Sequence, residues 1–311
     1  MVFVYIIYAN WQVNGHFNLK CIFVVMNFSD KKTVRVAILD LYEGVANQGM
    51  RCIREIIDNW SIENNVDIER DEFEVRLLEE MPGLEYDLYI SSGGPGSPMD
   101  SEGSTWEEKF FNWVQRLADY NNNPDNSQKK YAFFICHSFQ LMARQFNIGA
   151  VRKRRSTAFG IFPIHMLPEG DNEYLFKGLC DPFYAMDSRD YEVVEPDHVQ
   201  LAALNATILA IEKERPHVPY ERAIMAVRFN NYFIGTQFHP EADSIGMTMY
   251  LQREDKKKTI VHNYGLEKWQ SMMKQLNDPD KIMWTYNHLL PNFLNLAIHL
   301  PTATTTPALR C

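Results

Sequence analysis

Apolar runs and amphipathic stretches alternate along the first half of the chain. Residues 34–42, VRVAILDLY, form an apolar run rich in β-branched side chains with Gly44 close behind it, which predicts a buried parallel strand that ends in a loop. The folded region is expected to continue with a helix over residues 47–60, because apolar side chains recur there at helical spacing: Met50, Ile53, Ile56, Ile57 and Trp60.

The same alternation continues well into the middle of the chain. Helices are expected over residues 105–120, with Ser104 or Thr105 as the N-cap, and over residues 138–147. Strands interleaved with helices predict an α/β fold with a mostly parallel central sheet that helices cover on both faces. The further strands of this sheet are expected over residues 73–78, 86–91 and 131–135.

The second half of the chain mixes strand and helix patterns. Residues 223–229 and 232–238 alternate around an Asn-Asn pair, which is typical of a hairpin and adds antiparallel strands to the sheet. Beyond Glu241 the pattern turns helical, and residues 283–297 carry an apolar helical face. That face needs a partner. Packing on the protein's own sheet is expected ahead of a lid or a homo-oligomer contact through the C-terminal helices.

The two ends of the chain differ from the region between them. Residues 1–32 begin with an apolar stretch but lack the basic segment of a secretory signal, so they form either an added pair of strands or a segment upstream of a true start at Met26. The polar lead-in after Met26 favours the second alternative. Residues 301–311, PTATTTPALRC, have too little apolar content to pack and are expected to form a flexible tail. Between these ends we expect a domain over 33–243 and a helical extension over 244–300.

Composition narrows the class of protein. With 311 residues, 46% of them hydrophobic and 23% charged, the chain suits one large globular domain with an appendage. A net charge of −9 gives no overall field for phosphate backbones, and the one dense basic run, residues 151–156, is short and expected to be a solvated loop or strand edge. No apolar run reaches the roughly eighteen residues of a membrane span. Neither nucleic acid nor a membrane is therefore an expected partner.

The five cysteines are odd in number and widely scattered, without a CxxC pair: Cys21, Cys52, Cys136, Cys180 and Cys311. This pattern favours a reducing compartment, and hence a cytoplasmic protein, over a disulfide framework or a cysteine-rich zinc site.

Cys136 stands where an apolar strand pattern, AFFI, meets a helix pattern. In an open α/β sheet this junction lies at the carboxyl edge, where ligands bind. The unpaired N–H groups and the positive end of the following helix favour the thiolate. A buried structural cysteine is an equally good interpretation of this stretch alone, so a partner for the thiol has to decide between the two.

Two further stretches supply candidate partners for the thiol. His239 follows an apolar strand pattern and Glu241 lies two positions on, so in an extended segment the carboxylate can orient the imidazole. A cysteine, a histidine base and an acid form a nucleophilic triad. Residues 91–98, SSGGPGSP, form a glycine-rich loop at another strand end, whose backbone N–H groups suit an oxyanion hole.

These three stretches together resemble the signatures of a class I glutamine amidotransferase domain, of the kind seen as the glutaminase domain of GMP synthase. The matching motifs are GGPGSP at 93–98, FICHSFQ at 134–140 and FHPEAD at 238–243, and the likeness spans residues 34–243. The resemblance implies a flavodoxin-like α/β fold and hydrolysis of the side-chain amide of glutamine.

The resemblance assigns roles to individual residues. It makes Cys136 the nucleophile, His239 the base and later the acid, and Glu241 the group that orients the histidine. The oxyanion hole would consist of the backbone amides of Gly94 and His137. The glutamine pocket would be lined by Gly96, Gln140 and Ser188.

Several positions depart from the family pattern. Phe134 and Ser138 stand where the family motif GxCxGxQ has glycines. Residues beside a strained nucleophile are normally small, which serine satisfies and phenylalanine does not. Arg189 replaces a histidine of an SHxDxV segment, and Ala158 replaces a glutamate. Because most of these changes fall on the substrate pocket, they bear on the substrate more than on the triad.

The function expected from the resemblance is release of glutamate and ammonia from glutamine through a cysteine thioester. This reaction requires neither a metal nor an organic cofactor, so none is expected. The chain has no GxxxxGK[ST] nucleotide loop and no room for a synthetase domain after Glu241, so the ammonia acceptor is expected on a separate synthetase chain. Three alternatives stay open: an amide or γ-glutamyl hydrolase, an acyltransferase on the same fold, and a binding module with impaired catalysis.

Overall fold

The computed structural model describes residues 3–13, 16–26, 33–45, 47–216, 220–278 and 280–298. Near the N-terminus, strands β1 (Phe3–Val13) and β2 (His16–Met26) pair antiparallel. This pair of strands is one of the two arrangements expected for the region, and a true start at Met26 stays a prediction. The polar lead-in and the tail expected over 301–311 lie outside the described residues.

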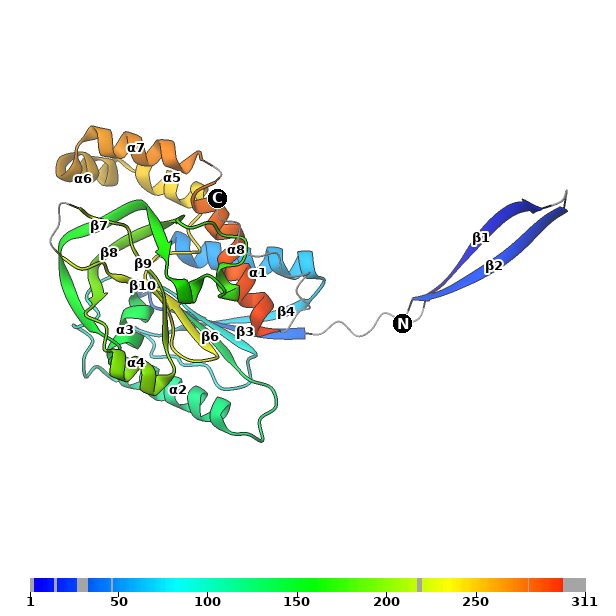
Figure 1. Ribbon diagram of the computed structural model, residues 1–311, viewed down its shortest axis with the longest axis horizontal. Coiled ribbons are helices and arrows are strands. Elements are labelled where there is room, and N and C mark those ends of the chain that lie inside the picture. The colour runs from blue at the N-terminus through cyan, green and yellow to red at the C-terminus, as the bar shows by residue number, and fades with distance from the viewer. Residues whose placement is uncertain are drawn as a thin grey trace.

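A nine-stranded sheet forms the centre of the domain, in the order β4-β3-β5-β6-β11-β10-β9-β7-β8 (Figure 1). Neighbouring strands are parallel in its first part, which consists of β4 (Asp67–Glu74), β3 (Thr33–Asp40), β5 (Leu88–Ser91), β6 (Tyr131–Ile135) and β11 (Phe233–Thr236). Neighbours are antiparallel in the second part, which adds β10 (Ile224–Arg228), β9 (Thr207–Glu212), β7 (Ala150–Met166) and β8 (Phe183–Val194). The predicted α/β fold is confirmed.

Helices lie on both faces of this sheet (Figure 1). One face carries α1 (Gln48–Asn64) and α8 (Ile282–Ala297), and the other carries α2 (Thr105–Asn122), α3 (His137–Gln145) and α4 (His198–Leu204). The remaining helices pack against one another and against β7: α5 (Ser244–Gln252), α6 (Glu254–Tyr264) and α7 (Leu266–Leu276). Two short 3₁₀ turns, η1 (Pro168–Gly170) and η2 (Tyr174–Phe176), follow β7. No helix in the described ranges is long and apolar enough to cross a bilayer.

Some predicted elements have different ends, and three strands have no predicted counterpart. The strand expected over 73–78 is β4, which instead ends at Glu74. It is an edge strand with the sequence DIERDEFE, and its many charged residues hide the apolar pattern by which a strand is recognised. Strands β7, β8 and β9 likewise mix charged and apolar residues. The basic run over 151–156 lies in β7, beside a break in strand register, and the Arg154 side chain in it is only 6% exposed.

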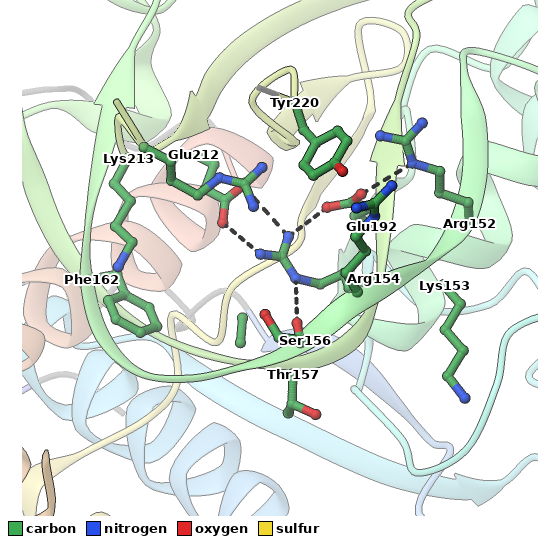
Figure 2. A pocket seen from close by; sticks show the side chains of 13 residues that line it. Arg152, Lys153, Arg154, Ser156, Thr157, Phe162, Glu192, Glu212, Lys213 and Tyr220 are labelled. Carbon is green, nitrogen blue, oxygen red and sulfur yellow. Dashed lines mark hydrogen bonds and ion pairs between the residues drawn. The ribbon is translucent and has the colours of Figure 1, made fainter. Parts of the chain in front are cut away.

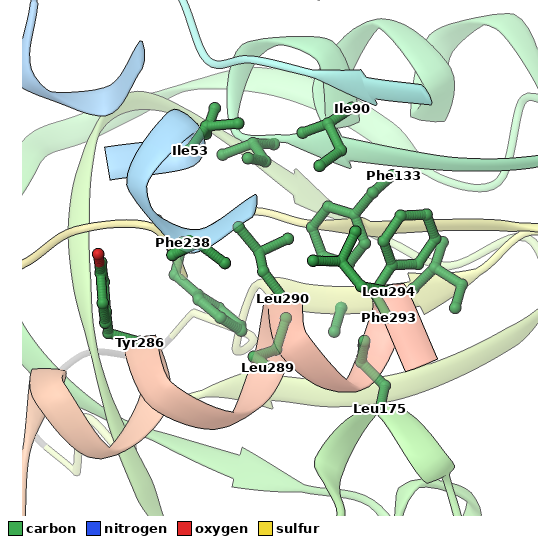
Figure 3. Close-up of a cluster of buried hydrophobic side chains, with 14 of the residues drawn as sticks. Ile53, Ile90, Phe133, Leu175, Phe238, Tyr286, Leu289, Leu290, Phe293 and Leu294 are labelled. Atoms are coloured by element: carbon green, nitrogen blue, oxygen red, sulfur yellow. The ribbon is translucent and has the colours of Figure 1, made fainter. Parts of the chain in front are cut away.

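Alternating side chains of the buried strands fill two cores, one on each face of the sheet. In β6, Phe133 points into the core shared with α1 and α8, and Phe134 into the core shared with α2 and α3. The ring centroid of Phe293 in α8 lies 5.1 Å from that of Phe133 (Figure 3). The apolar face of α8 is therefore covered by the protein's own sheet, which confirms the packing alternative. A domain boundary at residue 243 and an oligomer contact through the other C-terminal helices stay predictions.

Phe134, which stands where the related motif has a glycine, is fully buried in a cluster of aromatic rings. Its ring centroid lies 6.0 Å from that of Phe233 and 6.5 Å from that of Phe229. The residue paired with it on β11 is Gly235, where an added Cβ would lie 2.9 Å from Cδ2 of Phe139 and 3.1 Å from the Phe134 carbonyl oxygen. The small residue that this region needs is therefore at position 235 instead of 134.

Replacing Gly235 by alanine should destabilise the fold by roughly 1–3 kcal/mol, since the added methyl group forces the neighbouring rings to move. A urea titration followed by circular dichroism measures this loss. If the clash with Phe139 is the cause, Gly235→Ala combined with Phe139→Leu should lose less stability than the two single changes added together. Equal stability of the wild type and the Gly235→Ala protein would contradict the argument.

Candidate active site

Cys136 lies at the junction of β6 and α3 in a strained backbone conformation. Its φ of 48° and ψ of −95° fall in a region that residues other than glycine rarely adopt. The chain therefore turns sharply between strand and helix, as in the nucleophile elbow of α/β-hydrolases. The buried thiol lies with Sγ 3.8 Å from the carbonyl oxygen of Ser188 on β8.

Hydrogen bonds hold this turn in place. The N–H of Cys136 donates to the carbonyl of Thr236 at the end of β11, at 2.7 Å. The hydroxyl of Ser138 accepts from the N–H of Ile135 at 2.8 Å and lies 3.0 Å from the carbonyl oxygens of Ile135 and Ser91. Its single proton serves one of these two carbonyls at a time. The serine that replaces a family glycine thus ties the turn to the end of β5.

His239 and Glu241 approach Cys136 from the loop after β11. Nδ1 of His239 lies 2.9 Å from Oε1 of Glu241. The imidazole lies beside Cys136, because a single Cβ added to Gly93 would be close to both side chains. The N–H of His239 donates to the carbonyl of Met186 on β8 at 2.8 Å, which fixes the loop beside the strand that carries Ser188. The structure therefore brings the three predicted triad residues together.

The charges around His239 favour its protonated form. Burial lowers the pKa of this imidazole, but the negative charges of Glu241 and Cys136, with hydrogen bonds to both, outweigh burial and hold the pKa well above its usual value of 6.5. Glu241 is buried against the first turn of α1, where an added Cβ on Gly49 would lie 3.2 Å from its Oε1. Oε1 of Glu241 therefore lies beside the N-terminal turn of α1.

The glycine-rich loop after β5 lies directly against this pair. A Cβ added to Gly93 would lie 2.9 Å from Cε1 of His239 and 3.5 Å from Cβ of Cys136. A Cβ added to Gly94 would lie 2.5 Å from the carbonyl oxygen of Leu41. Neither position has room for a side chain, so glycine is required at 93 by its approach to His239 and Cys136, and at 94 by its approach to Leu41.

The backbone N–H groups expected to bind an oxyanion are available. As the first residue of α3, His137 has no preceding helical carbonyl for its N–H, and that of Gly94 has no backbone acceptor within the described residues. The His137 imidazole is buried, and burial with the nearby charges of Arg76 and Arg144 lowers its pKa to about 3. It is therefore neutral and a weak base at neutral pH, which leaves His239 as the candidate base.

The predicted substrate-pocket residues differ in their placement. Ser188 contacts Cys136 through its carbonyl, and Gly96 adopts a φ of 86° within the glycine loop. Gln140 is buried, with its Nε2 3.0 Å from Oε1 of Gln237, and Gln237 donates to Sγ of Cys136 at 3.6 Å. Gln140 is therefore connected to Cys136 through Gln237, and a direct contact of Gln140 with a substrate stays a prediction.

Three further residues at this site were not predicted from the sequence: Tyr42, Arg76 and Gln237. A Cβ added to Gly93 would lie 3.3 Å from the Tyr42 hydroxyl, and burial raises the pKa of this phenol well above its usual value. Arg76 donates to the carbonyl of Pro95 in the glycine loop at 2.7 Å. Tyr42 and Gln237 each lie within two residues of the end of a parallel strand, and that position is the signal that could have identified them.

Arg189 and Ala158, which replace family residues, face each other across β8 and β7. The Arg189 side chain is buried and forms ion pairs with Asp187 at 2.9 Å and with Glu212 at 3.3 Å. Its guanidinium is therefore bound within the protein and is not exposed to a substrate.

The side chains at this site are arranged for nucleophilic catalysis, with a thiol, an imidazole and a carboxylate in sequence. Within the part of the chain that the structure describes, no three His, Cys, Asp or Glu side chains converge as metal ligands would. Cys52 and Cys136 are free thiols, whereas Cys180 is in a disulfide, so the sequence argument against disulfides fails at Cys180.

Comparisons with known proteins agree with this geometry. The family model for glutamine amidotransferase class-I matches residues 38–255. No curated protein sequence is significantly similar to the chain. A crystal structure of a glutamine amidotransferase from Thermotoga maritima matches with a TM-score of 0.60 at 15% identity, covering 86% of this chain and 99% of that one. The CTPS glutaminase domain from Trypanosoma brucei, with bound acivicin, matches with a TM-score of 0.53 at 15% identity, covering 87% and 96%.

The two kinds of match carry different weight. Structural likeness at such low identity supports the fold alone. The family model covers well over half of the 311 residues and includes the glycine loop, Cys136, His239 and Glu241. The chain belongs to the class I glutamine amidotransferase family.

Proposed function

We propose that this protein hydrolyses the side-chain amide of glutamine through a thioester on Cys136. The observation that carries the proposal is the position of His239, which lies beside Cys136 with its Nδ1 2.9 Å from Oε1 of Glu241. Membership of the amidotransferase family supports glutamine as the substrate. In such a pair the sulfur is a ready nucleophile, and the proton needed by the leaving group is held beside it.

In the first half of the reaction, the Cys136 thiolate adds to the amide carbon. The oxyanion accepts hydrogen bonds from the N–H groups of Gly94 and His137. The His239 imidazolium gives its proton to the departing nitrogen, the C–N bond breaks and ammonia leaves.

In the second half, the neutral His239 imidazole takes a proton from water as the water oxygen adds to the thioester carbon. The C–S bond then breaks, which releases glutamate and restores the thiolate–imidazolium pair. Water is the only co-reactant in this sequence.

The ammonia is proposed to pass to a synthetase on a separate chain, as family membership suggests. Glutamine labelled with heavy nitrogen in its amide, supplied to this protein together with a candidate synthetase, tests the transfer. More label in the synthetase product than an equal concentration of free labelled ammonium gives would support it. Equal labelling from the two sources would speak against a direct transfer.

Cys136→Ala should lower glutamine hydrolysis by at least about 10³-fold, because the whole covalent route is removed. Release of glutamate and ammonia, measured by a coupled assay, tests this. Cys52→Ala is the matched control, since Cys52 is the second free buried thiol among the described residues and should be dispensable for activity. Unchanged turnover in Cys136→Ala would sink the triad assignment. A wild-type protein that acivicin labels at Cys136 but that leaves glutamine intact would favour a binding module instead.

Glu241→Gln should move the alkaline limb of the pH profile to lower pH. The charge of Glu241 is one of the causes that raise the pKa of His239, so the wild-type imidazolium persists above the usual value of 6.5 and is lost only as pH rises further. The glutamine side chain introduced at position 241 has almost the same shape as glutamate but lacks its charge, so the His239 imidazolium is lost at lower pH. We expect kcat/KM to fall by at least about 10-fold near the alkaline end of the profile. An alkaline limb that stays in place would contradict this role for Glu241.

A further inference from the structure

A cavity of about 600 Å³ opens between β7, β8 and β9, beside the register break of β7 (Figure 2). The protein as a whole carries a net charge of −9, yet this cavity has six cationic side chains in its lining and only two acidic ones. Such a concentration of positive charge attracts anions. The cations are Arg152, Lys153, Arg154, Arg155, Lys213 and Arg215.

The two carboxylates of the cavity are already shared among guanidinium groups. Arg154 lies between Glu192 at 2.6 Å and Glu212 at 3.0 Å (Figure 2). Arg152 also pairs with Glu192 at 3.1 Å, and Arg215 also pairs with Glu212 at 3.2 Å. Each carboxylate therefore faces at least two arginines, and the lining offers no further negative charge to the other cations.

Arg155 and Lys213 are held in the cavity without a carboxylate partner. In the described part of the chain, neither has a carboxylate oxygen within 4.0 Å. The guanidinium carbon of Arg155 lies 4.3 Å from the ring centroid of Tyr220. Nζ of Lys213 lies 3.7 Å from the ring centroid of Phe162 (Figure 2). A cation on a ring face is oriented while its N–H donors stay free for another acceptor. Burial lowers the pKa of Lys213, as expected for an ammonium group with too little negative charge around it.

A chain of contacts connects this cavity to the nucleophile. Its successive distances between polar atoms are 3.3, 3.4, 3.3, 3.0 and 3.6 Å. A change of partners at Glu212 can therefore reach the thiol through groups in direct contact. From the cavity inward, the chain runs through Glu212, Arg189, the carbonyl group of Tyr191, Gln140, Gln237 and Sγ of Cys136.

We propose that this cavity binds a phosphorylated small molecule and that its occupancy changes the reactivity of Cys136. A phosphate group carries up to two negative charges and three acceptor oxygens, which suit the free donors of Arg155 and Lys213. The cavity is larger than one phosphate group needs and falls in the range of about 300–1,000 Å³ typical of small-molecule sites. The rest of the ligand therefore fits beside the phosphate.

The coupling follows from competition for Arg154. A bound phosphate draws this guanidinium away from Glu212, and the carboxylate then shifts towards Arg189, the next group in the chain of contacts. This second part of the proposal takes Cys136 as the nucleophile of the proposed function, whereas binding in the cavity does not depend on that function.

Calorimetric titration of the whole chain with sodium pyrophosphate, at constant ionic strength, tests the site. Saturable binding at one site per chain is expected, weakened about 10-fold or more by the double change Arg155→Ser and Lys213→Met, since each removes a charged hydrogen-bond donor. The matched control is Lys109→Met with Arg116→Ser, which removes two exposed cations from α2 and should bind as the wild type does.

Two results of this titration would overturn the site: no saturable binding, or equal affinity in the two double variants. A parallel titration with citrate separates phosphate from carboxylate chemistry. Weaker binding of citrate supports the assignment, and tighter binding of citrate would overturn the choice of phosphate.

Alkylation of Cys136 by iodoacetamide, followed by mass spectrometry, tests the coupling without any need for turnover. Saturating pyrophosphate should change the alkylation rate by about 5-fold or more. Gln237→Met removes the donor to Sγ, so this variant should still bind pyrophosphate but lose the response. An unchanged rate in the wild type would overturn the coupling. Loss of glutamine turnover alone would count only against the proposed function, because neither binding nor alkylation is measured through it.

Discussion

The backbone conformation of Cys136 is the constraint on which the site depends. A φ of 48° and a ψ of −95° are unfavourable for a residue with a side chain, at about 1–3 kcal/mol, so the surroundings must hold them in place. The bond to Thr236 ties the turn to β11, and Ser138 ties it to β5. These are the two neighbours of β6 in the sheet, and they also carry the His239 loop and the glycine loop. The two strands that stabilise the strained turn therefore also bring the parts of the site together.

The departures from the family pattern fit this constraint. A sharp turn between a strand and its helix needs a small residue nearby, but the need belongs to a place in the fold and not to one sequence position. Gly235 meets it from the adjacent strand, so Phe134 can fill the core between α2 and α3 with its ring. At position 138, where the family also has a glycine, the serine hydroxyl lies next to the turn and forms hydrogen bonds there. The sequence alone shows the missing glycines but not these replacements.

The difference between a sequence position and its place in the fold also determines which parts of the structure could be predicted. Parallel strands buried on both faces produce continuous apolar runs, so β6 was located to the residue, and the meeting of Cys136 with His239 followed from their strand ends. In β8 the apolar pattern is interrupted by charges such as Arg189, which usually indicate exposure but here are paired inside the protein. The role of Gln140 was hidden for a similar reason, because a sequence does not distinguish an amide that faces a substrate from one bonded to Gln237.

The buried charges of β7, β8 and β9 are not needed for stability as such. Breaking one pair, for example at Glu212, would leave an uncompensated charge and cost about 3–5 kcal/mol, yet a well-packed apolar set of the same volume is often equally stable. What an ionic network has and an apolar core lacks is the ability to exchange partners when another charge arrives. Arg154 and Arg189 share the carboxylate of Glu212, Arg154 on the side of the cavity and Arg189 on the side of Cys136. An anion can therefore disturb this interior through one guanidinium, whereas an apolar core of equal stability would not respond to it.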